Sequence, residues 1–290
     1  MPNNQKVILI TGTSSGFGLL TAARLGSRGH FVYATMRDLK KQQPLLDEAA
    51  KRKGQVNVRA LDVTQTASIT KVVEEIKNYH GHMDVLINNA GFGLGGFFED
   101  LSDDEIRGQM EVNFFGVQNV TRAVIPLMRE QGRGRIINIS SIAGQTASPC
   151  LSAYNASKWA LEGFSESLYH ELALFGIDVV LIEPGSYPTK IFFDNARYAK
   201  NFNNRQSPYY PFSQRLKAMV DNYIHRCRKD PEDIAKLIEQ IINTNKPRLR
   251  YISDVPSWAH VMGRKLLPEP VYGHFFRGII FGKQIKVGRI

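Results

Sequence analysis

Two side chains with complementary chemistry stand four residues apart in this sequence. Tyr154 and Lys158 lie in the stretch Ser152-Ala153-Tyr154-Asn155-Ala156-Ser157-Lys158-Trp159, which has helical character. Both side chains should therefore project from one face of a helix. A free phenol, with a pKa of about 10, is a poor acid or base at neutral pH, but a neighbouring ammonium favours the phenolate. The pair predicts acid–base catalysis; the alternative is an exposed helical tyrosine beside a solvated lysine.

A glycine-rich turn near the N-terminus indicates a dinucleotide site. The turn reads Thr11-Gly12-Thr13-Ser14-Ser15-Gly16-Phe17-Gly18 and lies between an apolar β-type run and an amphipathic helical pattern. Gly12 allows a tight turn after the strand, Gly16 lets the backbone approach a pyrophosphate, and Gly18 permits close helix packing. The spacing is Gly-x-x-x-Gly-x-Gly, which differs from the more familiar Gly-x-Gly-x-x-Gly fingerprint.

With the motifs between them, these two features resemble the short-chain dehydrogenase/reductase family over most of residues 5 to 190. Asp62-Val63 is similar to the family's adenine-contacting pair, and Asn88-Asn89-Ala90-Gly91 to the motif that closes its fourth strand. Pro184-Gly185 followed by Thr189 resembles its nicotinamide-binding stretch. Weaker similarities, in residues 32–38 and 246–251, point to the branch that contains estradiol 17-beta-dehydrogenase and retinol dehydrogenases.

The resemblance implies a catalytic tetrad of Asn113, Ser141, Tyr154 and Lys158. A hydride would pass between a nicotinamide ring and a carbonyl or carbinol carbon while Tyr154 gives or takes the proton of the oxygen. Ser141 would hydrogen-bond that oxygen, Lys158 would lower the tyrosine pKa and hold the nicotinamide ribose, and Asn113 would anchor a proton-carrying water. We expect no metal site. The implied cofactor contacts are Gly12, Ser14, Ser15, Gly16, Phe17, Gly18, Arg37, Asp62, Val63, Asn89, Ala90, Gly91, Tyr154, Lys158, Pro184, Gly185 and Thr189.

Short apolar β-type runs alternate with longer helical patterns, which predicts an α/β fold. We expect a single doubly wound Rossmann-type domain over residues 1–290, with a seven-stranded parallel sheet and helices on both faces. The glycine turn, Asn88, Ser141 and Pro184 each follow a strand, so they should converge at the carboxyl edge of the sheet. The expected strands are Val7 to Ile10, Phe31 to Thr35, Val56 to Leu61, Val85 to Ile87, Arg135 to Ser140, Val179 to Glu183 and Arg248 to Ile252.

The end of the second expected strand favours NADP(H) as cofactor. This position reads Met36-Arg37 and lacks the carboxylate that would select NAD by binding the adenine ribose. Arg37 offers a guanidinium suited to phosphate, and Ser15 could add a hydroxyl. NAD(H) stays an alternative, because a strand boundary shifted by one or two residues would bring Asp38 to the ribose.

Residues 186–230 lack sheet or helix periodicity and are rich in aromatic side chains. We expect a substrate lid after strand six, and a bulky apolar substrate such as a steroid-, retinoid- or lipid-like ketone or alcohol. The alternative is that these aromatics fix the segment to the core or to another subunit. They are Tyr187, Phe192, Phe193, Tyr198, Phe202, Tyr209, Tyr210, Phe212 and Tyr223.

Positive charge is concentrated towards the C-terminus. Residues 201–290 contain 16 Lys+Arg against 7 Asp+Glu, in a chain whose formal net charge is +10. No nucleic-acid recognition motif accompanies this charge, so nucleic acid is not an expected partner. The tail from 256 to 290 interleaves basic and bulky apolar residues, which predicts peripheral contact with anionic membranes rather than insertion. The alternative is a tail packed on its own domain.

We expect a cytoplasmic homodimer or homotetramer that binds a small-molecule substrate. Cys150 and Cys227 are too few for a disulfide framework, which suits a reducing compartment. The first strand begins almost at the N-terminus, and no apolar run approaches about 20 residues. The subunit interface is expected at the helices that begin near Ser102 and Ala153.

Two other functions fit parts of this pattern. A nucleotide-binding redox sensor or scaffold protein would keep the fold but would not need all four tetrad residues. A sugar-nucleotide epimerase or dehydratase also uses a Tyr/Lys pair, but such enzymes usually have a different glycine spacing and a longer C-terminal substrate domain.

Overall fold

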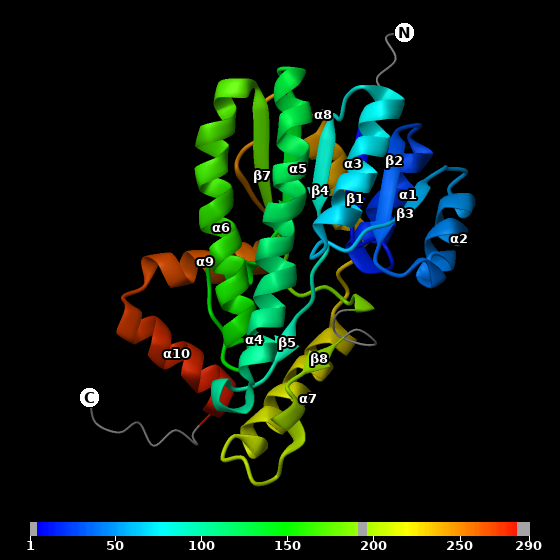
Figure 1. Cartoon of the computed structure of the whole chain (residues 1–290). Helices are drawn as coiled ribbons and strands as arrows, with labels where there is room; N and C mark the ends of the chain where they lie inside the picture. The colour runs from blue at the N-terminus through cyan, green and yellow to red at the C-terminus, as the bar shows by residue number, and fades with distance from the viewer. Residues whose placement is uncertain (1–4, 191–195, 283–290) are drawn as a thin grey trace.

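The main sheet has seven parallel strands, and the predicted α/β fold class is confirmed. The computed structural model describes residues 5–190 and 196–282. The strand order is β3-β2-β1-β4-β6-β7-β9 (Figure 1). The order changes direction between β1 and β4, which is where ligands bind in such sheets. The strands are β1 (Val7–Thr11), β2 (Phe31–Met36), β3 (Asn57–Ala60), β4 (Val85–Asn88), β6 (Gly134–Ile139), β7 (Ile177–Glu183) and β9 (Arg250–Ile252).

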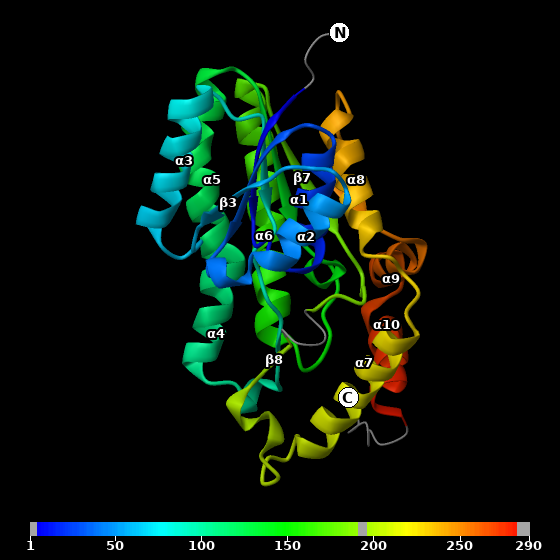
Figure 2. The same cartoon turned by 90° about the vertical axis from the view of Figure 1, so that its right-hand side faces the viewer.

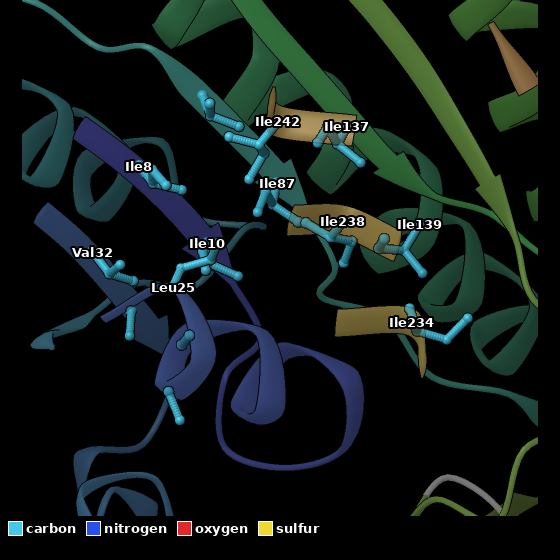
Figure 3. Packing of buried hydrophobic residues seen from close by; sticks show 14 of the residues in the cluster. Ile8, Ile10, Leu25, Val32, Ile87, Ile137, Ile139, Ile234, Ile238 and Ile242 are labelled. Atoms are coloured by element: carbon cyan, nitrogen blue, oxygen red, sulfur yellow. The ribbon is translucent and has the colours of Figure 1, made fainter. Parts of the chain in front are cut away.

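Each strand divides its side chains between two hydrophobic layers. Ile8 and Ile10 of β1 belong to one buried cluster, whereas Val7 and Leu9 belong to the other. Side chains alternate between the faces of a strand, so an apolar run buries both faces at once. Figure 3 shows the first layer, in which helix α8 lies against the sheet through Ile234, Ile238 and Ile242.

Helices cover both faces of the sheet (Figure 2). The first layer is covered by α1 (Gly16–Ser27), α2 (Gln43–Lys51) and α8 (Glu232–Asn243). The second is covered by α3 (Thr66–His80), α5 (Gly116–Glu130) and α6 (Ser152–Leu172). Helix α4 (Asp103–Met110) begins with a capping box between Ser102 and Glu105. Short helical turns are η1 (Leu39–Lys41), η2 (Phe98–Asp100), η4 (Ile142–Gly144), η5 (Ala173–Phe175) and η7 (Lys200–Asn203).

The predicted lid segment, 186–230, contains more regular structure than its sequence pattern suggests. Strand β8 (Arg197–Tyr198) pairs with β5 (Leu94–Gly95) in a separate two-stranded sheet, and α7 (Tyr210–Arg226) is a helix. Only Ser213 and Ile224 of α7 are buried, so this helix makes little contact with the core. Phe192 and Phe193 of the predicted lid lie outside the described residues.

The predicted tail folds, as far as it is described, into two helices. We call α9 (Val255–Leu266) and α10 (Glu269–Phe281) the C-terminal helix pair. His260 Nε2 lies 2.9 Å from the Tyr272 hydroxyl, and the rings of Tyr272 and Phe276 stack with centroids 5.5 Å apart. Within 5–190 and 196–282, no helix combines the length and apolarity needed to cross a bilayer. Lys283, Lys286 and Arg289 of the predicted tail lie outside the described residues.

Candidate functional site

Ser141, Tyr154 and Lys158 lie together at the carboxyl end of β6. Ser141 follows β6 and caps η4, where its Oγ accepts a hydrogen bond from the Ala143 N–H at 3.1 Å. Tyr154 and Lys158 are one turn apart on α6, and Lys158 Nζ lies 5.8 Å from the Tyr154 ring centroid. A hydrogen bond joins the side chains of Ser141 and Tyr154. Two elements thus bring three of the predicted catalytic residues to one place.

Burial dominates the electrostatics of the tyrosine–lysine pair. It raises the pKa of the Tyr154 phenol, while the hydrogen bond with Ser141 acts in the opposite direction. Burial also lowers the pKa of Lys158 to about 8, whereas the Glu162 carboxylate, one turn further along α6, acts to raise that pKa. Lys158 Nζ donates to the carbonyl of Ile139 at 2.8 Å. In this structure the hydrogen bond with Ser141 acts to lower the pKa of Tyr154, and burial outweighs it.

Asn113 lies in a single turn of π-helix, η3 (Glu111–Phe115), between α4 and α5. Its Oδ1 accepts from the Phe92 N–H at 3.0 Å, and its Nδ2 donates to the Phe92 carbonyl at 2.9 Å and to Ser157 Oγ at 3.2 Å. Ser157 Oγ donates to the Tyr154 carbonyl at 2.7 Å. Single π-turns within helices frequently occur at functional sites. Asn113 thus connects the chain after β4 to α6, through a serine that sequence reasoning misses.

The glycine turn is packed against the segment that follows β4. Gly12 has φ +72°, and a Cβ there would lie 2.6 Å from the Ala90 Cα. A Cβ on Gly18 would lie 2.3 Å from Asn89 Nδ2, which donates to the Gly12 carbonyl at 2.8 Å. Thr11 Oγ1 accepts the N–H groups of Asn89 and Ala90 at 3.1 Å each. Gly12 and Gly18 therefore allow two predicted cofactor-binding segments to meet, and Thr11 joins them.

Helix α1 begins in the same turn. Ser14 precedes its N-cap residue Ser15, and its first residue is Gly16, with φ +59°. The first turn of α1 carries no acidic residue, so its N–H groups favour an anion such as a pyrophosphate. A Cβ on Gly16 would lie 3.7 Å from the Thr189 side chain. The predicted nicotinamide-binding stretch thus reaches the glycine turn through Thr189.

The residues at the end of β2 and just after it lie in different environments. Met36 is 2% exposed and belongs to the hydrophobic core, whereas Arg37 is exposed. The Asp38 carboxylate accepts a hydrogen bond from the Lys40 N–H at 3.0 Å and caps η1. Of the residues that the sequence considers for cofactor selection, Arg37 is therefore the exposed cation, and Asp38 has a local structural role.

Asp62 and Val63 shape the turn after β3. The Asp62 Oδ1 accepts from the Thr64 N–H at 3.0 Å and from the Thr64 hydroxyl at 2.8 Å. Val63 is buried, and a Cβ on Gly116 of α5 would lie 2.5 Å from its Cγ2. Contact of this pair with adenine stays a prediction.

Pro184 and Gly185 follow β7 but have different neighbours. The Pro184 carbonyl accepts from the Ile142 N–H at 3.1 Å and from the Ser141 hydroxyl at 3.4 Å. A Cβ on Gly185 would lie 2.0 Å from Ser257 Oγ of α9. Pro184 therefore adjoins Ser141, the serine predicted to be catalytic, and Gly185 packs against the C-terminal helix pair. A Cβ on Gly91 would lie 3.1 Å from Asn113 Oδ1, so Gly91 also adjoins the tetrad.

Several aromatic residues of the predicted lid fix the segment to the protein instead of facing a substrate. Tyr187 is buried in the hydrophobic core and contacts Phe17 edge-on, with ring centroids 5.5 Å apart. Phe202 is buried in a small cluster with Leu94 and Leu101. Tyr209 stacks on Phe97 at 4.6 Å. Tyr198 and Tyr223 remain 36% and 52% exposed.

The buried carboxyl groups of Glu162 and Glu183 lie close to Arg250. Sequence reasoning misses this cluster. The Arg250 Nε is 2.9 Å from Glu162 Oε2 and 3.5 Å from Glu183 Oε1. Gln145 also donates to the Glu183 carboxylate. Burial, helped by the Glu162 charge, raises the pKa of the Glu183 carboxyl to about 7, while Arg250 acts to lower it. These residues come from four separate segments, so no sequence motif marks the cluster.

Comparison with known proteins shows that the chain is similar to members of one family. A family model described as short chain dehydrogenase matches residues 6–197. The 3-ketodihydrosphingosine reductase of Bacteroides thetaiotaomicron is 40% identical over 84% of this chain and 86% of its own. Retinol dehydrogenase 8 of Bos taurus is 34% identical over 86% of this chain and 82% of its own.

Solved structures of the family with either nicotinamide cofactor are similar to this chain. A short-chain dehydrogenase/reductase from Burkholderia phymatum in complex with NAD is 26% identical, with a TM-score of 0.78 over 91% of this chain and 95% of its own. A metagenomic short-chain oxidoreductase in complex with NADP is 28% identical, with a TM-score of 0.67 over 85% of this chain and 96% of its own.

Proposed function

Because the chain belongs to the short-chain dehydrogenase family, we propose that it is an NADP(H)-dependent oxidoreductase that acts on a carbonyl or hydroxyl carbon. The observation that carries this proposal is the cluster of Ser141, Tyr154 and Lys158 at the carboxyl end of β6. A phenol, a hydroxyl and a cation converge there beside the turn that suits a dinucleotide.

The residues at the carboxyl ends of β1 and β2 fit a dinucleotide cofactor. The positive φ of Gly16 and its missing side chain leave the start of α1 accessible, and the N–H groups of a helix start favour a pyrophosphate. Arg37, exposed after β2, supplies a cation for the adenosine end. The other predicted cofactor contacts line the same edge of the sheet.

The nicotinamide of the bound cofactor exchanges a hydride with the substrate carbon. Tyr154 gives a proton to the carbonyl oxygen in reduction and takes it back in oxidation. Ser141 hydrogen-bonds the same oxygen as charge develops on it. Lys158 holds the nicotinamide ribose, and its ammonium favours the phenolate. Asn113, whose amide fixes Phe92 and Ser157, anchors the water that returns protons to Lys158.

NADP(H) is proposed as the preferred cofactor, with NAD(H) as the alternative. Arg37 has no carboxylate partner among the contacts of residues 5–190 and 196–282, so its guanidinium can meet a phosphate. Asp38, the acid that could favour NAD, is engaged in capping η1. Both features support a cofactor that carries a 2'-phosphate.

The proposed substrate is bulky and apolar: a steroid-, retinoid- or lipid-like ketone or alcohol. The names of two relatives refer to 3-ketodihydrosphingosine and to retinol, which both carry a long hydrocarbon part. In the lid segment, the half-exposed rings of Tyr198 and Tyr223 can offer apolar contact area. The buried Tyr187 and Phe202 are not part of this proposal.

We also propose a homodimer or homotetramer formed through α4 and α6. Trp159 of α6 and Phe115 of η3 are large apolar side chains that are about half exposed. Exposed aromatic residues of this kind are typical of subunit interfaces. Light scattering after size exclusion checks the assembly.

The C-terminal helix pair is proposed to contact anionic membranes from the cytoplasmic side. Val271, Phe275 and Ile279 recur every fourth residue on α10, and all three are exposed. They form one apolar stripe, and Lys265 and Arg277 are exposed on the same helix pair. Exposed apolar and basic side chains together support a peripheral contact.

A carbonyl panel with NADPH tests the proposed activity. Steroid, retinoid, aliphatic ketone and quinone substrates are incubated with the protein while NADPH absorbance is followed. Oxidation of NADPH that depends on an apolar carbonyl supports the reductase. Cofactor binding without turnover of any substrate would instead favour a redox sensor or scaffold protein.

A further inference from the structure

Arg197 belongs to the lid segment but lies beside the segment that follows β4. It begins β8, which pairs with β5 so that Arg197 is in register with Leu94. Strand β5 begins three residues after Asn89-Ala90-Gly91, the segment that packs on the glycine turn. Figures 1 and 2 show β8 at one end of the main sheet, together with α7. The small sheet therefore carries Arg197 to the segment after β4, although the two are about a hundred residues apart in sequence.

The Arg197 side chain is supported by an aromatic ring. Its Cζ lies 4.0 Å from the centroid of Phe92. The backbone of Phe92 is itself fixed on both sides by the Asn113 amide, at 3.0 Å and 2.9 Å. A guanidinium stacked on an aromatic face keeps its N–H edge available for an anion, and the stacking reduces the entropy lost on binding.

Arg197 lies within electrostatic range of a second unpaired arginine. Partial burial lowers the pKa of Arg197, and the positive charge of Arg37 lowers it further. Among the contacts of the described residues, neither guanidinium has a carboxylate partner. Two cations that repel each other without a counter-ion form a site that an anion would stabilise. Arg37 follows β2, where the adenosine end of the proposed dinucleotide would lie, so its interaction with Arg197 places this pair near that end.

We propose that Arg197 is a second ligand, beside Arg37, for the 2'-phosphate of NADP(H). The inference rests on the proposed function and makes it more specific. The pyrophosphate has its own donors at the start of α1, whereas the 2'-phosphate would lie near Arg37 after β2. Because Arg197 belongs to β8, binding of the phosphorylated cofactor would also hold the lid segment against β5. NAD(H) would lack this link.

Cofactor titrations of Arg197 variants test this assignment without relying on turnover. Binding of NADPH and of NADH is followed by cofactor fluorescence for the wild type, Arg197→Met, Arg197→Lys and Arg37→Met. Lys200→Met is the matched control, because Lys200 is an exposed cation on the same segment, three residues away. Circular dichroism and the thermal midpoint confirm that each variant is folded.

The expected result is selective for the phosphate. Arg197→Met should weaken NADPH binding by about tenfold, as expected for a lost charge-assisted hydrogen bond, and should change NADH binding less than about twofold. Arg197→Lys should lie between, because it keeps the charge and loses the planar fork. Lys200→Met should behave like the wild type.

Two outcomes would overturn the role of Arg197. One is an unchanged NADPH affinity in Arg197→Met; the other is an equal loss for NADPH and NADH, which would place Arg197 on a part common to both cofactors. The proposed cofactor preference fails separately, if the wild type binds NADPH no more tightly than NADH. An NADPH preference that is undiminished in Arg197→Met contradicts the inference alone.

Discussion

The Tyr154 hydroxyl is the single group assigned to move the substrate proton. Tyr154→Phe removes this hydroxyl and keeps the half-buried ring, so the packing of the ring is preserved. We expect kcat to fall by more than tenfold, a loss above about 1.4 kcal/mol of transition-state stabilisation. The Kd for NADPH should change by less than about twofold. Steady-state kinetics and fluorescence titration measure the two quantities.

Tyr169→Phe is the matched control, because Tyr169 is an exposed tyrosine further along the same helix. It should retain the wild-type kcat. The assignment of Tyr154 would be wrong if Tyr154→Phe kept more than about a tenth of the wild-type kcat.

Residues in contiguous motifs could be predicted from the sequence, and residues joined only by the fold could not. Tyr154 and Lys158 are one helical turn apart, and Gly12 to Gly18 occupy one turn, so spacing alone groups them. Arg197 reaches the segment after β4 only because β8 pairs with β5. No pattern near Arg197 indicates that pairing. The buried state of Met36, likewise, depends on how β2 packs on α2.

At the scale of elements, the cluster of Glu162, Glu183 and Arg250 connects α6, β7 and β9. Burial raises the pKa of Glu183 to about 7, above its ordinary value near 4.5. The folded state thus binds the proton more tightly than the unfolded state. The stabilisation from this proton is fully present below pH 4.5 and is lost as the pH rises through about 7.

Glu183→Gln should remove this pH dependence, because the amide stays neutral. The wild type should lose about 2 kcal/mol of unfolding free energy relative to the variant between pH 5 and pH 8. Urea unfolding at both pH values measures the difference. Glu166→Gln is the control: Arg250 lowers the pKa of Glu166, so this carboxylate is ionised throughout that range. An equal change in unfolding free energy between the two pH values for wild type and Glu183→Gln would contradict this prediction.

The strands of the sheet were predictable because each carries two hydrophobic faces, whereas the lid helix was not. Ile8, Ile10, Val7 and Leu9 form an unbroken apolar run that only a strand covered on both sides requires. Helix α7 buries little of its surface, with only Ser213 and Ile224 buried. A weakly buried helix leaves little trace in the sequence.

At the scale of the whole molecule, the C-terminal helix pair gives the protein an exposed apolar surface. Phe275 and Ile279 are 65% and 55% exposed on α10. We expect the wild type to co-sediment with phosphatidylserine vesicles at low salt and to be released at high salt, because each basic residue near an anionic surface contributes about 1 kcal/mol. The double variant Phe275→Asp/Ile279→Asp should lose most of this binding.

Leu174→Asp is the matched control, because Leu174 is an exposed leucine in η5, outside the helix pair. It should bind vesicles as the wild type does. Equal sedimentation of all three proteins would rule out a membrane contact through the helix pair.

Transfer of a labelled hydride tests the central claim most directly. The protein is incubated with an apolar ketone that it reduces and with NADPH carrying deuterium at the reactive C4 position, and the alcohol product is examined by mass spectrometry. The account predicts one deuterium on the carbinol carbon of the product formed by the wild type, and no such product above background with Tyr154→Phe. An alcohol without deuterium from either C4-deuterated epimer of NADPH, or equal labelled product from both proteins, would contradict it.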